Sequence, residues 1–112
     1  MNRHTLERIF SQSLVSAALN QSYDFAQETS IKAIYLKAST NITETITITL
    51  ISPNGSNYDI ILDTKTLNAE QNYVFHPLWD LNIIKGASIK IQCTNANITG
   101  TIYGTLHAEG GN

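Results

Sequence analysis

Hydrophobic and polar residues alternate with a period of two over most of this chain, which is the pattern of strands with one buried face. The clearest stretch runs from Glu44 to Ile51, where aliphatic residues alternate with threonine. The residues predicted to face the core are Ile46, Ile48 and Leu50, and those predicted to face solvent are Thr45, Thr47 and Thr49. We therefore expect a strand that is buried on one side only.

A hairpin is predicted directly after this strand. Ser52-Pro53-Asn54-Gly55 follows it, and Asn-Gly suits the positive φ angles of a tight turn. The partner strand is predicted from Asn57 to Asp63. Its inward side chains are expected to be Tyr58, Ile60 and Leu62, and its outward ones Asp59, Ile61 and Asp63.

The same alternation predicts further short strands, separated by turn residues. Their ranges are Ser22–Phe25, Lys32–Ala38, Asn72–His76, Ala87–Thr94 and Ile98–His107. The predicted core-facing residues are Ile34, Leu36 and Ala38, then Ile89, Ile91 and Cys93, then Ile98, Ile102 and Leu106. Residues 64–71 are expected to form a loop or one helical turn, and residues 78–86 a long apolar connection.

The first twenty residues fit two structures. Leu6, Ile9, Phe10 and Leu14 recur at helical spacing, whereas residues 11–19 also fit a strand. We predict a helix or an extended arm through Phe10, followed by a strand.

About eight short strands with turns between them are typical of an all-β, antiparallel β-sandwich of the jelly-roll or Greek-key type. The pattern disfavours a parallel α/β fold, because no helical stretch of crossover length separates consecutive strands. The predicted organisation is an N-terminal arm or first element over 1–20, a β-sandwich domain over 21–108 and a flexible tail over 109–112.

Charge is scarce in this sequence. Seven Lys and Arg against nine Asp and Glu give a net charge of −2, and charged residues make up 14% of the chain, against about 25% in typical soluble domains. This balance predicts neither a nucleic-acid partner nor an anionic membrane partner, and a surface with little self-repulsion favours close packing of subunits. We also expect no transmembrane segment and no signal peptide, because no apolar run is long enough.

We predict no catalytic, no cofactor-binding and no metal-binding residues, and hence no cofactor and no enzymatic activity. His4, His76 and His107 lack the spacing of metal ligands. Cys93 is predicted to be buried, where a thiol is a poor nucleophile. Asp59 and Asp63 lie about 13 Å apart along a strand, too far for a glycosidase pair. The glycines of the last strand, at positions 100 and 104, indicate a bulge or close packing rather than a ligand cradle.

Two features are compatible with binding, each with a plainer interpretation. The threonine row at positions 45, 47 and 49 fits a flat ice-binding surface, but it is also typical of any half-exposed strand. Trp79, with Tyr73, Phe75 and His76 nearby, could stack on a sugar, or it could close one end of the sandwich.

The order of these segments resembles that of the small β-sandwich structural proteins of tailed bacteriophage virions, whose members are decoration, fibre or tail-associated proteins. The segments that carry the resemblance are Ser22-Tyr23-Asp24-Phe25, residues 31–38, Thr45-Ile46-Thr47-Ile48-Thr49-Leu50, Ser52-Pro53-Asn54-Gly55, Asn57-Tyr58-Asp59 and Gly100-Thr101-Ile102-Tyr103-Gly104-Thr105-Leu106. The resemblance implies a copy-rich virion component, made in the host bacterial cytoplasm, whose partners are copies of itself and other virion structural proteins.

We therefore expect a non-enzymatic virion structural protein that forms a homo-oligomer. Residues 1–20 are expected to act as an assembly element lying on a neighbouring copy, because their apolar side chains exceed what one sandwich end can cover. The alternative for this segment is an element folded back on its own sandwich. The alternative for the whole chain is a carbohydrate-binding or adhesin-like module that uses Trp79 and nearby aromatic residues to bind a cell-surface glycan.

Overall fold

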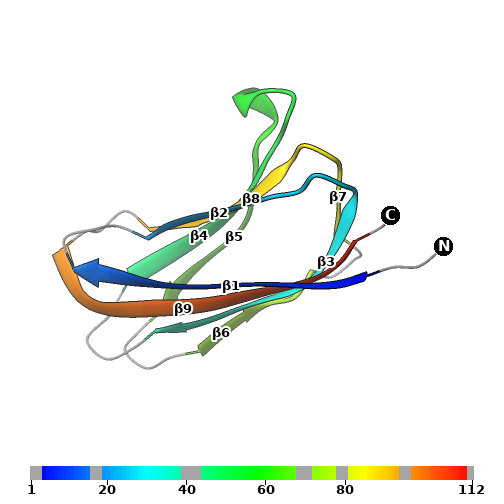
Figure 1. Ribbon diagram of the computed structural model, residues 1–112. Helices are drawn as coiled ribbons and strands as arrows, with labels where there is room; N and C mark the ends of the chain where they lie inside the picture. Colours follow the sequence, from blue (N-terminus) through cyan, green and yellow to red (C-terminus); the bar gives the residue numbers. More distant parts are fainter. Residues whose placement is uncertain are drawn as a thin grey trace.

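The computed structural model describes residues 4–15, 19–38, 44–67, 72–77, 81–93 and 97–110, and it folds them into two antiparallel sheets (Figure 1). The elements are β1 (His4–Val15), β2 (Asn20–Asp24), β3 (Thr29–Ala38), β4 (Glu44–Ile51), the short 3-10 helix η1 (Ser56–Tyr58), β5 (Ile60–Leu67), β6 (Asn72–Phe75), β7 (Leu81–Ile83), β8 (Ser88–Gln92) and β9 (Asn97–Gly110). One sheet has the order β1-β9-β3-β6, with β7 also paired to β3, and the other has the order β2-β8-β4-β5. The predicted antiparallel β-sandwich is confirmed.

The core lies between the two sheets and is almost entirely aliphatic. Its predicted members on β3, β4 and β8 are confirmed: Ile34, Leu36, Ala38, Ile46, Ile48, Ile89, Ile91 and Cys93 are all buried, and Leu50 packs against them. Ile102 and Leu106 of β9 are buried as predicted, whereas the side chain of Ile98 lies outside the described residues. Alternation with a period of two predicted the buried faces of these strands correctly, because each strand has one side against the opposite sheet.

The N-terminal helix is a wrong prediction. Residues 4–15 form strand β1, which pairs with β9 from His4 opposite Gly110 to Val15 opposite Asn97. The long β9 pairs with this segment along most of its length, with one irregularity between Ser13 and Val15. A sequence pattern that fits both a helix and a strand does not reveal this pairing. Ile9 is exposed, whereas the side chains of Leu6, Phe10, Leu14 and Val15 lie outside the described residues.

The β4–β5 hairpin forms, but not through a tight Asn-Gly turn. The connection runs from Ser52 to Asp59 and contains η1, and the first strand pair beyond it is Leu50 opposite Ile60. Tyr58 is exposed in η1. Ile60 shares the face of Leu50, but it is exposed because the hairpin projects beyond the other sheet (Figure 1). The burial predicted for these two side chains is therefore wrong.

A bulge then reverses the predicted facing of β5. Ile48 pairs with Asp63 and Thr49 with Ile61, so Leu62 is an extra residue in β5. After an extra residue the alternation changes sides. Asp63 therefore shares the core-side face of Ile48, against the prediction, and four pairs further on, opposite Glu44, Leu67 is fully buried. Leu62 itself packs partly against the core, and Ile61 is exposed as predicted.

Three strands include residues that were predicted to form a loop, a connection or a tail. β5 continues to Leu67 within the predicted loop, β7 forms inside the predicted connection, and β9 continues to Gly110 within the predicted tail. The added part of β5 continues the pairing with β4 in the same hairpin, whereas β7 pairs with β3, and the end of β9 pairs with β1 and β3, which are distant in sequence. Among the described residues, no helix is long and apolar enough to span a membrane.

Candidate functional site

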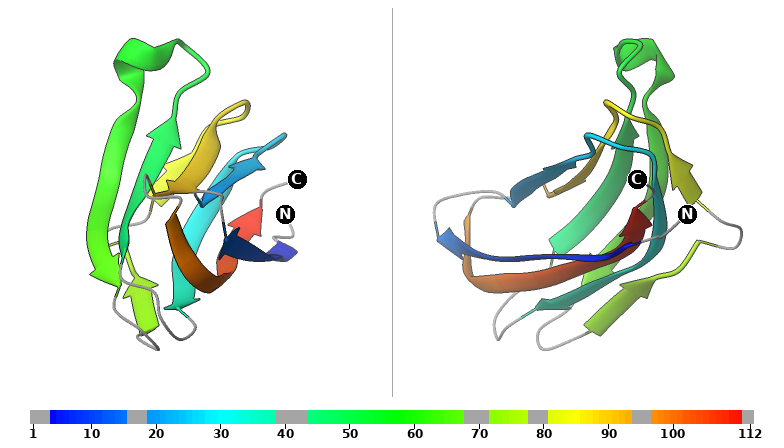
Figure 2. Two further views of the ribbon diagram at one scale, coloured as in Figure 1. Left: turned by 90° about the vertical axis from the view of Figure 1, so that its left-hand side faces the viewer. Right: turned by 45° about the vertical axis from the view of Figure 1, so that its right-hand side comes forward.

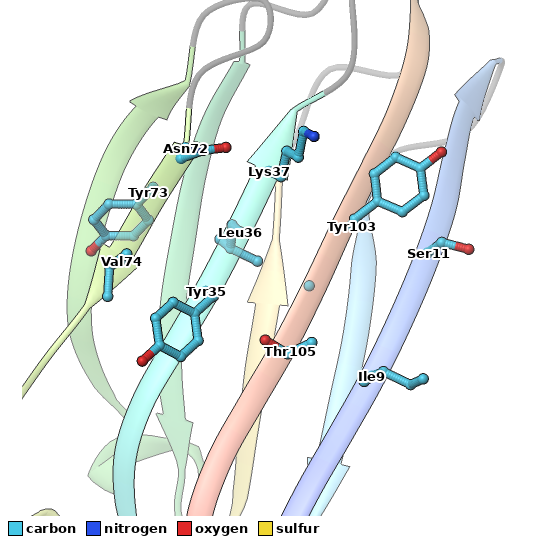
Figure 3. Close-up of a pocket in the computed structure, with 11 residues that line it drawn as sticks. Ile9, Ser11, Tyr35, Leu36, Lys37, Asn72, Tyr73, Val74, Tyr103 and Thr105 are labelled. Carbon is cyan, nitrogen blue, oxygen red and sulfur yellow. The ribbon is translucent and has the colours of Figure 1, made fainter.

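An open groove of about 780 Å³ lies on the outer face of the β1-β9-β3-β6 sheet. Figure 3 shows Ile9, Tyr35, Tyr103 and Thr105 on the side of this sheet that faces away from the other sheet, whereas Leu36 belongs to the core. The groove is lined by Ile9, Ser11, Tyr35, Leu36, Lys37, Asn72, Tyr73, Val74, Tyr103, Gly104 and Thr105. It crosses four strands, so no single segment of the chain defines it.

Strand register brings the exposed groove side chains into two rows across the sheet. The first row is Ile9, Thr105, Tyr35 and Val74, and the second is Ser11, Tyr103, Lys37 and Asn72. Ile9, Val74, Tyr35 and Tyr103 are between 39% and 70% exposed. These four side chains give the groove an apolar and aromatic surface, which is unusual for a sheet face that no described element covers.

Two histidines border Tyr35. The ring centroid of His107 lies 5.0 Å from that of Tyr35 with an interplanar angle of 72°, and His76 lies at 6.2 Å with an angle of 86°. These edge-to-face contacts fix the position of the Tyr35 ring. His107 Nε2 is 3.2 Å from Glu7 Oε2, which links β9 to β1 beside the groove. The histidines therefore form part of an aromatic cluster.

Among the described residues that line the groove, Lys37 is the one that carries a charge. Its neighbours across the strands are Tyr103 and Asn72, so its ammonium belongs to a polar row beside an apolar one. Such a surface suits a partner that offers apolar side chains together with a carboxylate or hydrogen-bond acceptors.

Two further tyrosines face the interior. Burial raises the pKa of Tyr23 from 10.0 to about 12, and the positive charge of Arg8 on β1 opposes part of that rise. The Tyr73 hydroxyl is buried and has no hydrogen-bond partner among the described residues. Tyr73 contributes to the groove and also packs partly against the core.

The residues singled out for chemistry are placed apart from one another. Cys93 is buried, and its Sγ accepts a hydrogen bond from the Leu19 amide at 3.2 Å. Asp59 and Asp63 accept backbone hydrogen bonds, from Ser52 at 2.8 Å and from Thr64 at 2.9 Å. Within the described ranges, no group of three His, Cys, Asp or Glu side chains could hold a metal ion.

The aromatic site that the structure presents differs from the one centred on Trp79. Trp79 lies outside the described residues, and Tyr73 and Phe75 pack partly against the core. Sequence reasoning missed the pair Tyr35 and Tyr103, although the alternation that places Leu36 and Ile102 in the core also places these two tyrosines on the outward faces of their strands. Only the β9–β3 pairing, which places them diagonally across two strands, brings them together.

No protein-family model matches the sequence, and no curated protein matches it. Two solved structures have a similar arrangement of the chain. One is a chain of the T13 viral particle of infectious bursal disease virus, with 12% identity and a TM-score of 0.45, which covers 92% of this chain and 31% of its own. The other is a chain of the infectious bursal disease virus Gx strain, with 14% identity and a TM-score of 0.41, which covers 96% of this chain and 32% of its own. This chain thus spans about a third of the length of these viral chains, neither of which comes from a tailed bacteriophage.

Proposed function

We propose that this chain is a non-enzymatic structural protein of a virion, which assembles with copies of itself and contacts other virion proteins. The observation that carries the proposal is the groove, because large apolar side chains gather there on a sheet face that no described element covers. Contiguous apolar surface of this kind marks an interaction site in soluble proteins.

The composition of this surface supports a protein partner. Interface centres are depleted of charged residues and enriched in tyrosine. The groove contains Tyr35, Tyr73 and Tyr103 but one charged residue, Lys37. The low charge of the whole chain acts in the same direction, since it reduces repulsion between neighbouring copies.

The N-terminal segment takes part in this surface. Ile9 and Ser11 of β1 line one side of the groove. We therefore keep residues 1–20 as an assembly element, now through a strand that belongs to the sheet of its own chain. The resemblance of the sequence to tailed-bacteriophage proteins supports a decoration, fibre or tail-associated position in the particle.

Sedimentation analysis across a range of protein concentrations tests the self-assembly. We expect a species larger than a monomer for the wild type and for Gln92→Ser, a control on the other sheet. Tyr103→Ser should weaken the assembly, raising its Kd by roughly tenfold, so that a higher protein concentration is needed to form it. A wild type that stays monomeric throughout contradicts the self-assembly.

Mass spectrometry of purified virus particles tests the virion role. The proposed role is wrong if the particles contain no peptides of this chain.

A second candidate function is carbohydrate binding, which a separate observation favours. Tyr35 and Tyr103 present their rings on the solvent side of the sheet beside Lys37 and Asn72 (Figure 3). Aromatic rings flanked by a few polar groups are typical of small-molecule sites. Reproducible binding on a glycan array that is lost in Tyr103→Ala and kept in Gln92→Ser supports this function, and an array without any signal opposes it.

A further inference from the structure

The described residues carry a second exposed apolar surface, at the end of the β4–β5 hairpin. We define the hairpin tip as residues 52–61. Tyr58, Ile60 and Ile61 in this tip are between 56% and 65% exposed. The tip projects beyond the neighbouring strands in each view (Figures 1 and 2). A protruding apolar surface needs a concave apolar partner if it is to leave water.

The tip is held in one conformation by its own hydrogen bonds. The Ser52 amide donates to Asp59 Oδ1 at 2.8 Å, and the Tyr58 amide donates to the Gly55 carbonyl at 3.0 Å. A Cβ atom at Gly86 would lie 3.4 Å from Pro53, so the loop after β7 approaches the base of the tip. A preformed protrusion loses little conformational entropy when it binds.

The tip cannot fill the groove of its own chain. It extends from the β2-β8-β4-β5 sheet, whereas the groove lies on the face of the other sheet that is directed away from that sheet (Figures 2 and 3). The two surfaces are therefore available at the same time on opposite sides of one molecule. A contact between them has to join two copies.

The two surfaces are complementary in chemistry. The tip presents one aromatic and two aliphatic side chains, and the groove presents tyrosine, valine and isoleucine. Asp59 is the one charged residue of segment 52–61, and Lys37 is the one charged residue among the described residues that line the groove. Opposite charges beside apolar side chains favour this pairing and its orientation.

We propose that the hairpin tip of one copy inserts into the groove of the next, with Tyr58 and Ile61 against Tyr35 and Tyr103. This inference rests on the self-assembly proposed above and names the contact that produces it. Because the two surfaces differ, the contact runs head to tail, and it builds a ring or an extended chain rather than a two-fold dimer.

The test uses two full-length variants, each with one surface disabled. The tip variant is Tyr58→Ser with Ile61→Ser, and the groove variant is Tyr103→Asp, which places a like charge opposite Asp59. Each variant alone should be monomeric at concentrations where the wild type and Gln92→Ser assemble. Mixed in equal amounts, the two variants should form a complex of one copy each, because one intact tip then meets one intact groove.

Circular dichroism and urea unfolding of each variant confirm that it is folded before it is used. A wild type that is monomeric throughout overturns the self-assembly and this contact with it. A wild type that assembles while the tip variant assembles equally well overturns this contact alone, and leaves the groove to another part of the neighbour. Two monomeric variants that do not combine also overturn it, since a tip-to-groove contact requires complementation.

Discussion

Shortening the side chain of Ile48 should lower the free energy of unfolding more than most single substitutions in the chain. Its side chain is fully buried at the centre of the core, on a strand paired with Ile91 on one side and Asp63 on the other. Ile48→Ala removes three carbon groups, worth about 2.4 kcal/mol at about 0.8 kcal/mol each. The cavity left in a tightly packed core adds to that loss, so we expect about 3 to 4 kcal/mol in all.

Thr47→Ala is the matched control, because Thr47 lies on the opposite face of the same strand and is half-buried. Its cost should stay below about 1 kcal/mol, and Ile48→Val should cost about 0.5 to 1.5 kcal/mol. Urea unfolding at one fixed protein concentration gives these values, since assembly would otherwise add to the apparent stability. Equal and small losses from Ile48→Ala and Thr47→Ala would refute the assignment of the two faces.

Three further predictions concern single residues. Because the pKa of Tyr23 is about 12 in the folded chain and 10.0 in the unfolded chain, its contribution to the free energy of unfolding is fully present below pH 10. This contribution should fall by roughly 2 to 3 kcal/mol as the pH rises to about 12, so urea unfolding across this range should show a loss that Tyr23→Phe lacks. Tyr73→Phe should be neutral or stabilising by up to about 1 kcal/mol in the same assay, because it removes a buried hydroxyl without a described partner; a clear loss would mean that the hydroxyl is hydrogen-bonded. Gly55→Ala should cost about 1 kcal/mol in thermal unfolding, although space is open around it, because φ is 116° there; an unchanged Tm would contradict this.

The parts of the fold that could be predicted from sequence are those that depend on local alternation. β4 has the predicted bounds, and the buried faces of β3 and β8 are as expected, because a strand against an opposite sheet needs apolar residues at every second position. β1 could not be assigned in this way. Ile9 and Phe10 fit a helical stripe as well as a strand, and the choice was made by β9, about ninety residues further along the chain.

The candidate site depends even more strongly on distant pairing. Tyr35, Val74 and Tyr103 are each outward residues of their strands, and nothing in the sequence around any one of them indicates a groove. They become neighbours because β9 enters between β1 and β3, and β6 joins the far side of β3. The sugar-binding interpretation of Trp79 used aromatic residues that are close in sequence, whereas the aromatic surface of the groove consists of tyrosines that sheet order brings together.

The hairpin tip shows where local alternation does not predict burial. In a regular strand, two successive residues cannot both face solvent when one side is covered, yet Ile60 and Ile61 are both exposed. The position of the tip produces this arrangement. Ile60 lies on the face of Leu50 but beyond the other sheet, Ile61 lies on the outward face, and both precede the extra residue Leu62. A polar residue at either position would satisfy the fold at no cost in burial, so two exposed isoleucines on a rigid protrusion are best explained by a contact that buries them in another molecule.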